Sequence, residues 1–296
     1  MDFNKIHIQQ LPVSTCFNQN KISLNVLRLD ELHPVVSGNK YFKLKLYLQQ
    51  AVSTKVNGIG TFGGAYSNHI VACAFACMEA GIPCTGIIRG EKPKSYNATL
   101  QDAKKYGMNL HFVSRQDYKE KEKLKNTFGD LYWIEEGGYG ILGASGIAEV
   151  YKYIRDAGNY NFIICAVGTG TMMAGLIINA EDHQQVLGIP VMKNNFSLEE
   201  KIQALLPEKN KMQQALLLHD FHFGGYAKCT PALIDFMNSI WKEYALPLDF
   251  VYTAKVFYAI DSLMKTNYFP QDSNILFIHS GGLQGNRSLP ENTLQF

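Results

Sequence analysis

Short apolar runs alternate with amphipathic segments along most of this 296-residue chain. The apolar runs end at glycine or other turn residues, as buried strands do, and the amphipathic segments repeat apolar residues every three or four positions, as helices do. Strands are predicted at residues 23–28, 58–62, 83–88, 109–113, 131–134, 161–167, 185–189, 216–221 and 274–279. Helices are predicted at residues 41–52, 68–80, 98–106, 118–127, 145–157, 172–180, 198–206, 231–244 and 256–266. Since the two kinds of segment alternate, the pattern favours the α/β class, with mostly parallel sheets covered by helices.

The same pattern predicts two domains. The strand–helix segments within residues 54–133 are sufficient for a sheet of their own, and the glycine-rich segment 135–143 can return the chain to a larger unit. We therefore predict a small domain at 54–133 and a large domain made of 1–53 and 134–296. A cleft between two such domains is a common place for a ligand.

Composition excludes several classes of protein. Hydrophobic residues make up 46% of the chain and charged residues 18%, so we do not expect disorder. The net charge is only +2, from 28 basic and 26 acidic residues, and we expect no nucleic-acid partner. No apolar stretch is as long as a bilayer span, and the first residues lack the features of a signal peptide. We predict a cytoplasmic protein without a membrane partner.

No metal site is predicted. The six cysteines do not indicate a disulfide scaffold in a chain of this length. Cys73 and Cys77 share one face of an apolar helical segment, and we expect small core residues because the CxxC spacing is absent. His219 and His222 fall on a predicted strand, where a spacing of three places them on opposite faces.

Two lysines at the start of a predicted helix are the first candidates for chemistry. Residues 37–43 read SGNKYFK, so Lys40 and Lys43 lie three apart and share one helix face. A desolvated lysine near other cations can hold a neutral amine, which forms a Schiff base with an aldehyde, and its neighbour could then bind a phosphate. An isolated pair of this kind is more often two exposed surface lysines, so the interpretation depends on two glycine loops.

The first glycine loop follows the predicted strand 58–62. It reads GGAYSNH at 63–69, and its glycines permit a tight turn and close approach of the backbone to a ligand. Ser67 is expected to cap the helix that starts at Asn68, and the backbone N–H groups up to His69 would bind a substrate carboxylate. A capped helix start without a ligand explains this loop equally well.

The second glycine loop follows the predicted strand 161–167 and reads GTGTMMAG at 168–175. The amides of Gly168, Thr169, Gly170 and Thr171, with the threonine hydroxyls, could hold a phosphate. A dinucleotide site is the competing interpretation, but the spacing is not GxGxxG and no acidic residue ends the next strand. A Walker loop is excluded because no lysine follows the glycines. Together, the lysines and both loops predict a site for a phosphorylated aldehyde cofactor.

With these residues the chain resembles the pyridoxal-phosphate enzymes of the tryptophan synthase β type, and within them the 1-aminocyclopropane-1-carboxylate deaminase and D-cysteine desulfhydrase family. The similarity extends from about residue 37 to about residue 285. It rests on GNKxxKL, GGxxSNH and TGxxxAG, on VYTAK at 251–255 and on HSGG at 279–282. The resemblance implies fold type II with two three-layer α/β domains, pyridoxal 5'-phosphate as cofactor, a small amino acid as substrate, and a homodimer.

The resemblance also implies which residues bind the cofactor. Lys40 matches the lysine that holds it as a Schiff base, and Lys43 matches the lysine beside its phosphate. Asn68 matches the asparagine at its phenolic oxygen. The loop 168–171 matches the phosphate loop.

Further matches imply the substrate side of the site. Ser67 matches a serine at the substrate, and its neighbours Asn68 and His69 would hold the carboxylate. Tyr226 and Tyr252 match two tyrosines that face the substrate, and either could protonate the leaving group. The α-proton would be removed by the Lys40 amine or by a hydroxyl held near it.

Two positions at the cofactor distinguish reactions within the family. The deaminases usually carry Glu and Leu where this chain has Thr253 and Ser280, which is similar to the desulfhydrase pattern. A carboxylate at the pyridine nitrogen makes the ring a strong electron sink, and a hydroxyl does so less. Opening a cyclopropane needs that sink more than loss of a thiolate does, so we expect β-elimination from D-cysteine. The alternatives are 1-aminocyclopropane-1-carboxylate deamination to 2-oxobutyrate and ammonia and, more remotely, a non-enzymatic nucleotide- or anion-binding protein.

Two features depart from the family pattern. The segment before residue 37 is abbreviated, and Met172 stands where the deaminase phosphate loop carries a hydroxyl residue. A methionine there would weaken cofactor binding or shift the phosphate.

Overall fold

The computed structural model describes residues 1–12, 21–36 and 38–296, and Ser37 of the lysine motif lies outside the described residues. The strands are β1 (Ile8–Leu11), β2 (Ser23–Arg28), β3 (Ile59–Gly64), β4 (Cys84–Arg89), β5 (Asn109–Val113), β6 (Tyr132–Ile134), β7 (Phe162–Val167), β8 (Gln185–Pro190), β9 (Ala215–Leu217) and β10 (Asn274–His279). They form one sheet in the order β1-β2-β10-β7-β8-β9 and a second in the order β5-β4-β3-β6. Only the β1–β2 pair is antiparallel among the described pairs. The predicted α/β class with mostly parallel sheets is confirmed.

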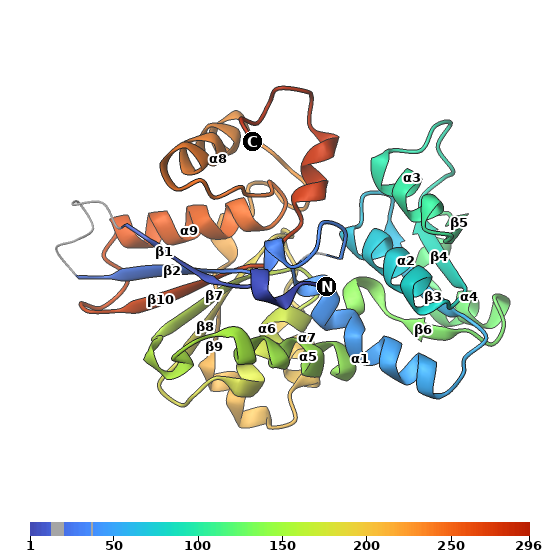
Figure 1. Ribbon diagram of the computed structural model, residues 1–296, viewed down its shortest axis with the longest axis horizontal. Coiled ribbons are helices and arrows are strands. Elements are labelled where there is room, and N and C mark those ends of the chain that lie inside the picture. Colours follow the sequence, from blue (N-terminus) through green and yellow to red (C-terminus); the bar gives the residue numbers. More distant parts are fainter. Residues whose placement is uncertain (13–20, 37) are drawn as a thin grey trace.

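Helices cover both sheets (Figure 1). The α-helices are α1 (Asn39–Ser53), α2 (Asn68–Ala80), α3 (Ala98–Lys105), α4 (Lys121–Thr127), α5 (Ile141–Ala148), α6 (Thr171–Asn179), α7 (Leu198–Leu205), α8 (Pro231–Tyr244) and α9 (Thr253–Lys265). The 3-10 helices are η1 (Phe3–Lys5), η3 (Leu29–Glu31), η4 (Asp117–Lys119), η5 (Glu136–Gly138), η6 (Glu149–Tyr153), η7 (Ala157–Asn159), η8 (Lys209–Gln214), η9 (His219–Phe221) and η10 (Leu283–Ser288).

The larger sheet is buried on both faces, which explains its nearly continuous apolar strands. Ile164 and Phe277 point to the face covered by α8 and α9. Ile163 and Leu276 point to the face covered by α5, α6 and α7. Each of these side chains is fully buried, and burial of one such side chain contributes about 1.5–3 kcal/mol.

Helix α1 packs on both sheets. Phe42 belongs to the core under the larger sheet, whereas Leu44 and Tyr47 belong to the core that α2 and α3 form on the smaller sheet. The other face of the smaller sheet packs on η4 and α4 through Phe62 and Tyr118. The N-terminal part of α1, which carries both candidate lysines, therefore lies between the two sheets. The division at residues 53 and 133 stays a prediction, since the smaller sheet takes its strands from residues 59–134 and shares α1 with the larger one.

One strand was missed and one was placed wrongly. The edge strand β1 contains Gln9 and Gln10 and shows no apolar run. The predicted strand 216–221 is wrong, because β9 ends at Leu217 and the chain then turns through η9. His219 and His222 therefore do not lie on one strand: Nε2 of His219 is 3.2 Å from Oε1 of Glu199, and Nδ1 of His222 accepts a hydrogen bond from a backbone N–H.

The predicted helix 145–157 is also displaced, because glycine here serves close packing and not chain breaking. Helix α5 begins at Ile141 and is followed by η6. A Cβ atom on Gly146 would lie 2.0 Å from the carbonyl oxygen of Phe42, so this glycine lets α5 approach α1. The predicted helix 256–266 also starts earlier than expected: α9 begins at Thr253, which places Thr253 and Lys255 in its first turn.

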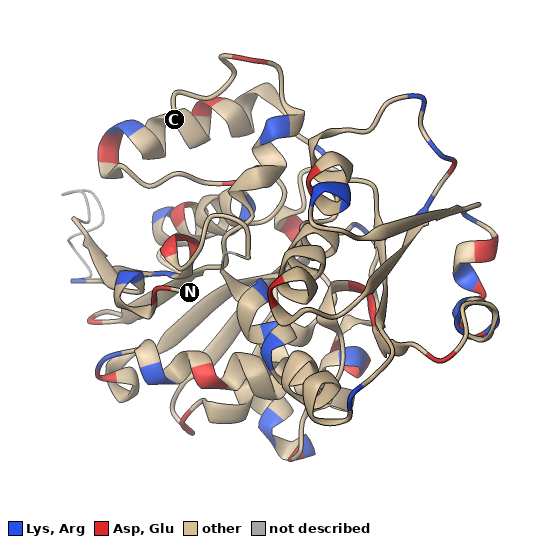
Figure 2. Cartoon of the chain, turned by 45° about the vertical axis from the view of Figure 1, so that its right-hand side comes forward, with Lys and Arg blue, Asp and Glu red and all other residues tan. Residues whose placement is uncertain are grey.

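The charged residues and the cysteines are placed as the composition led us to expect. Figure 2 shows Lys and Arg spread over many elements, with Asp and Glu among them. Among the described residues, no helix is both long and apolar enough to cross a bilayer. Cys73 and Cys77 are buried core residues, as predicted, and Cys84 joins them with its sulfur 3.9 Å from that of Cys73.

Candidate active site

Segments distant in sequence meet beyond the carboxyl ends of β3, β7 and β10, where ligands of parallel sheets commonly bind. The N–H of Asn39, at the start of α1, donates to the carbonyl of Ser280 at 3.1 Å. Gly38 has a φ of 58°, and a Cβ atom there would lie 1.9 Å from the same carbonyl oxygen, so only glycine fits. The Asn68 side chain reaches the carbonyl of Gly282 at 3.5 Å. These contacts join the starts of α1 and α2 to the segment after β10.

Lys40 is partly buried at this junction. Its Nζ donates to Oδ1 of Asn39 at 2.8 Å and lies 6.0 Å from the centroid of the Tyr252 ring. Burial lowers the pKa of Lys40 to about 8, and the negative charge of Asp249 opposes this effect. A substantial fraction of the amine is therefore neutral near pH 8, as a nucleophile or general base requires.

Lys43 is 5% exposed, one helical turn after Lys40. Burial and then the positive charge of Lys40 lower the pKa of Lys43 well below its usual range. Within residues 1–12, 21–36 and 38–296, no carboxylate forms an ion pair with Lys43. A buried lysine without a carboxylate partner, next to a second lysine, favours the binding of an anion.

A glycine turn lies between Lys43 and the threonine loop, since a Cβ atom on Gly137 would lie 3.0 Å from Cγ2 of Thr169. Helix α6 begins at Thr171, after Gly170 with a φ of 92°, and its first N–H groups have no partner within the helix. The hydroxyls of Thr169 and Thr171 are 3.1 Å apart. In η5, Gly138 has a φ of 72°, and a Cβ atom there would lie 3.1 Å from Cβ of Lys43, so glycine lets the turn close on the lysine without strain. The sequence showed this turn only as part of the glycine-rich segment 135–143.

Met172 does not face this loop. Its side chain is 2% exposed and belongs to the core under the larger sheet. The expected effect of this residue, weaker cofactor binding or a shifted phosphate, stays a prediction.

At the start of α2, polar groups are free for a ligand. Ser67 stands at the N-cap position, but its side chain makes no capping hydrogen bond, contrary to the prediction. Its hydroxyl is thus not committed to the helix. Oδ1 of Asn68 is buried without a hydrogen-bond partner. The Ser67 hydroxyl and the unpaired N–H groups of the first turn can donate to a carboxylate, whereas Oδ1 of Asn68 is an acceptor and would need a donor from a ligand.

His69 is neutral and holds a fixed tautomer. The Thr61 hydroxyl donates to the carbonyl of Ile134 at 2.8 Å, so it must accept the 2.8 Å hydrogen bond from Nε2–H of His69. Burial, followed by the charges of the two lysines, lowers the pKa of His69 to about 3. Nδ1 of His69 is left as a buried acceptor without a partner.

Tyr226 and Tyr252 are brought together from segments far apart in sequence. Their hydroxyls are 3.4 Å apart and their rings meet edge to face at 6.1 Å. Burial raises the pKa of both tyrosines, so both are protonated and can donate a proton or a hydrogen bond. They line a cavity of about 280 Å³, whose other walls are Tyr66, Asn68, Asn97, Ala98, Thr99, Ala227, Phe250, Val251, Gln284, Gly285, Arg287 and Ser288.

Thr253 is fully buried and bonded to a carboxylate that the sequence analysis missed. Its hydroxyl donates to Oδ1 of Asp249 at 2.8 Å and accepts from the N–H of Asp249 at 2.7 Å. Asp249 is fully buried and also accepts the N–H groups of Val251, Tyr252 and Thr253. Thr253 can therefore offer a ligand only a lone pair. Ser280 is 7% exposed beside the start of α1. The only signal for Asp249 was its place just before the VYTAK run.

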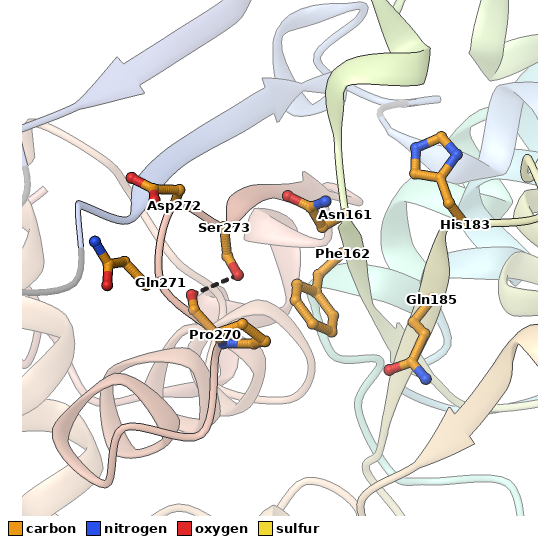
Figure 3. A pocket seen from close by; sticks show the side chains of 8 residues that line it. All are labelled: Asn161, Phe162, His183, Gln185, Pro270, Gln271, Asp272 and Ser273. Atoms are coloured by element: carbon orange, nitrogen blue, oxygen red, sulfur yellow. Dashed lines mark hydrogen bonds between the residues drawn. The ribbon is translucent and has the colours of Figure 1, made fainter.

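A hollow of about 390 Å³ lies at the amino ends of β7, β8 and β10 (Figure 3). Its wall is formed by Asn161, Phe162, His183, Gln185, Pro270, Gln271, Asp272 and Ser273. Ser273 Oγ donates to the Pro270 carbonyl at 2.7 Å, and the candidate lysines and tyrosines are absent from its wall. The candidate active site lies at the opposite end of the strands.

Comparison with known proteins agrees with this geometry. Residues 8–281 match the family described as "Pyridoxal-phosphate dependent enzyme". A putative 1-aminocyclopropane-1-carboxylate deaminase of Pyrococcus abyssi is 29% identical over 274 residues, covering 84% of this chain and 81% of the relative. The mitochondrial bifunctional D-cysteine desulfhydrase/1-aminocyclopropane-1-carboxylate deaminase of Arabidopsis thaliana is 27% identical over 295 residues, covering 90% and 74%. The crystal structure of an ACC deaminase homologue superposes with a TM-score of 0.79 at 25% identity, covering 95% of this chain and 90% of that one. The predicted resemblance is confirmed.

Proposed function

We propose, from the premise that this chain belongs to the pyridoxal-phosphate dependent enzyme family, that it eliminates the thiol of D-cysteine. In the overall reaction D-cysteine and water give pyruvate, hydrogen sulfide and ammonia. The observation that carries the choice of reaction is the hydroxyl of Thr253 at a position where the deaminases usually carry a carboxylate. A homodimer and a cytoplasmic location stay predictions.

The site fits pyridoxal phosphate. Lys43 and the loop 168–171 would hold the phosphate, since the lysine is buried without a carboxylate partner among the described residues and the loop opens a helix. Lys40 would hold the aldehyde carbon, and Oδ1 of Asn68 is a buried acceptor without a partner among the described residues, as is expected where a ligand completes the site. The bound cofactor supplies an electron-withdrawing ring, which stabilises negative charge at the α-carbon of an amino acid.

The protein's own groups would then bind the substrate and move its protons. The first N–H groups of α2, from Ser67 to His69, bind the carboxylate, because a helix N-terminus attracts an anion. The Lys40 amine takes the α-proton, since its pKa of about 8 leaves neutral amine available. The C–S bond breaks as the electron pair of the C–H bond forms the α,β double bond. A hydroxyl of the Tyr226–Tyr252 pair donates a proton to the departing sulfur.

Deamination of 1-aminocyclopropane-1-carboxylate is the second candidate, and one observation favours it. The Thr253 hydroxyl donates to Oδ1 of Asp249 at 2.8 Å. A carboxylate is therefore one hydrogen bond away from the position where a deaminase carries Glu. Several similar relatives also carry the name of that enzyme.

A direct assay distinguishes elimination from D-cysteine from deamination of 1-aminocyclopropane-1-carboxylate. The cofactor-loaded protein is given D-cysteine, L-cysteine or 1-aminocyclopropane-1-carboxylate, and pyruvate, sulfide and 2-oxobutyrate are measured. We expect pyruvate and sulfide in equal amounts from D-cysteine alone. Lys40→Met, which should lack the visible absorbance of covalently held cofactor, is the control for uncatalysed loss of sulfide. If 2-oxobutyrate from the cyclopropane substrate is the main product, the β-elimination proposal is wrong.

A further inference from the structure

Lys255 is a buried charge that the proposed chemistry does not use. Its side chain is fully buried in the first turn of α9. A cation is unfavourable there because the N-terminal end of a helix is itself positive. Burial lowers the pKa of Lys255 to about 8, although the facing groups Asp249 and Cys229 raise it. A lysine buried at the N-terminal end of a helix is destabilising there, so we expect that it serves a function.

The ammonium group binds backbone carbonyls and not a carboxylate. Nζ of Lys255 donates to the carbonyl of His222 at 2.9 Å and to that of Gly225 at 2.7 Å. These carbonyls begin and end a turn that is closed by the N–H of Gly225, which donates to the carbonyl of His222 at 3.0 Å. The lysine thus bridges both ends of one turn.

That turn has a costly backbone conformation. Phe223, Gly224, Gly225 and Ala227 have φ angles of 51°, 85°, 124° and 53°. Phenylalanine and alanine adopt the left-handed region only against a steric penalty, so external contacts must hold them there. The charge-assisted hydrogen bonds from Lys255 are such contacts.

The turn determines where Tyr226 points. Tyr226 follows Gly225 directly, lines the cavity, and places its hydroxyl 3.4 Å from that of Tyr252. Tyr252 immediately precedes α9, one turn before Lys255. One ammonium group therefore connects the segments that carry both tyrosines.

We propose that Lys255 is a positioning residue, which holds the 222–226 turn so that the Tyr226 hydroxyl meets the Tyr252 hydroxyl over the substrate cavity. The role of the tyrosines rests on the proposed function, whereas the state of the turn can be measured without turnover.

The first test is amide hydrogen exchange of residues 222–228 in the cofactor-loaded protein. Lys255→Met keeps the length and the apolar stem but removes the ammonium group. We expect exchange to be at least about tenfold faster in this segment, and unchanged in Lys265→Met, which removes an exposed lysine of the same helix. Lys255→Arg, which keeps a cation and donors, should exchange like the wild type. Unchanged exchange in Lys255→Met, or equal acceleration in Lys255→Arg, overturns the proposal.

The second test asks whether the lysine acts through Tyr226. With the substrate that the enzyme turns over, kcat and KM are measured for Lys255→Met, Tyr226→Phe and the double variant. We expect the double variant to match Tyr226→Phe within about threefold, because the lysine has no further role once the hydroxyl is gone. If the losses of activity in the two single variants multiply in the double variant, Lys255 acts elsewhere than through Tyr226. If residues 222–228 exchange faster in Lys255→Met but the wild-type enzyme does not turn over D-cysteine, the reaction assignment is wrong and this inference stands.

Discussion

Replacing Lys43 by methionine should have opposite effects on the protein with and without cofactor. Lys43 is 5% exposed, and burial with the neighbouring charge of Lys40 lowers its pKa well below its usual range. The empty site therefore carries the cost of a desolvated amine. The loaded site gains a charge-assisted contact with a phosphate.

The size of each effect follows from this environment. A hydrogen bond to a charged group contributes about 1.5–3 kcal/mol, so the Kd for pyridoxal phosphate should rise about 10- to 150-fold. Methionine has a similar length and needs no hydration, so the protein without cofactor should become about 1 kcal/mol more stable. For a chain of this size that corresponds to a rise in Tm of about 2 °C.

Fluorescence titration with pyridoxal phosphate and guanidinium unfolding of the cofactor-free protein measure the two quantities. Lys45→Met is the matched control, since Lys45 is on the same helix but pairs with Glu149 at 2.6 Å. It should leave the Kd unchanged and lose less than about 1 kcal/mol of stability. If Lys43→Met destabilises the cofactor-free protein, or binds the cofactor as tightly as wild type, the phosphate assignment of Lys43 is refuted.

Two other predictions concern the start of α1. Gly38→Ala should lower the free energy of unfolding by about 3 kcal/mol, since the new Cβ would lie 1.9 Å from the carbonyl oxygen of Ser280 at a φ of 58°; denaturant unfolding measures this, and a loss below about 1 kcal/mol would show that the junction is loose. The pH dependence of the free energy of unfolding of the cofactor-free protein should reflect Lys40, whose pKa is about 8 in the folded chain and 10.5 for an ordinary lysine. Above pH 8 the unfolded chain holds one more proton at this group, so stability from Lys40 should increase towards pH 10 by up to about 1.4 kcal/mol per unit. Lys40→Met should lack this increase in unfolding experiments across that range, and an identical slope in both proteins would contradict the lowered pKa.

Much of the site could be predicted because it is locally encoded. A strand, a glycine loop and a helix start lie within a few residues of each other, so the loops at Ser67–Asn68 and Thr169–Thr171 were recognisable without a fold. The spacing of Lys40 and Lys43 likewise needs only a helix. Met172 shows the limit of this reasoning, since its place in the motif did not reveal that it points into the core.

The groups that tune the site could not be predicted in this way. Asp249 accepts four hydrogen bonds within its own turn, but its effect on Lys40 depends on two segments more than 200 residues apart in sequence. Gly138 matters because it closes on Lys43 from another helix. Neither contact leaves a periodic signal in the sequence.

Local pattern thus determined the class of fold, the strand–loop–helix units and the segments that we propose for the cofactor, because hydrophobic periodicity and helix termini act over a few residues. Tertiary structure alone decided which amines are desolvated, that the charge of Asp249 acts on Lys40, and that Lys255 bridges a turn 30 residues before it. Burial and electrostatic coupling depend on what surrounds a group in space, and chain neighbours supply only a small part of those surroundings.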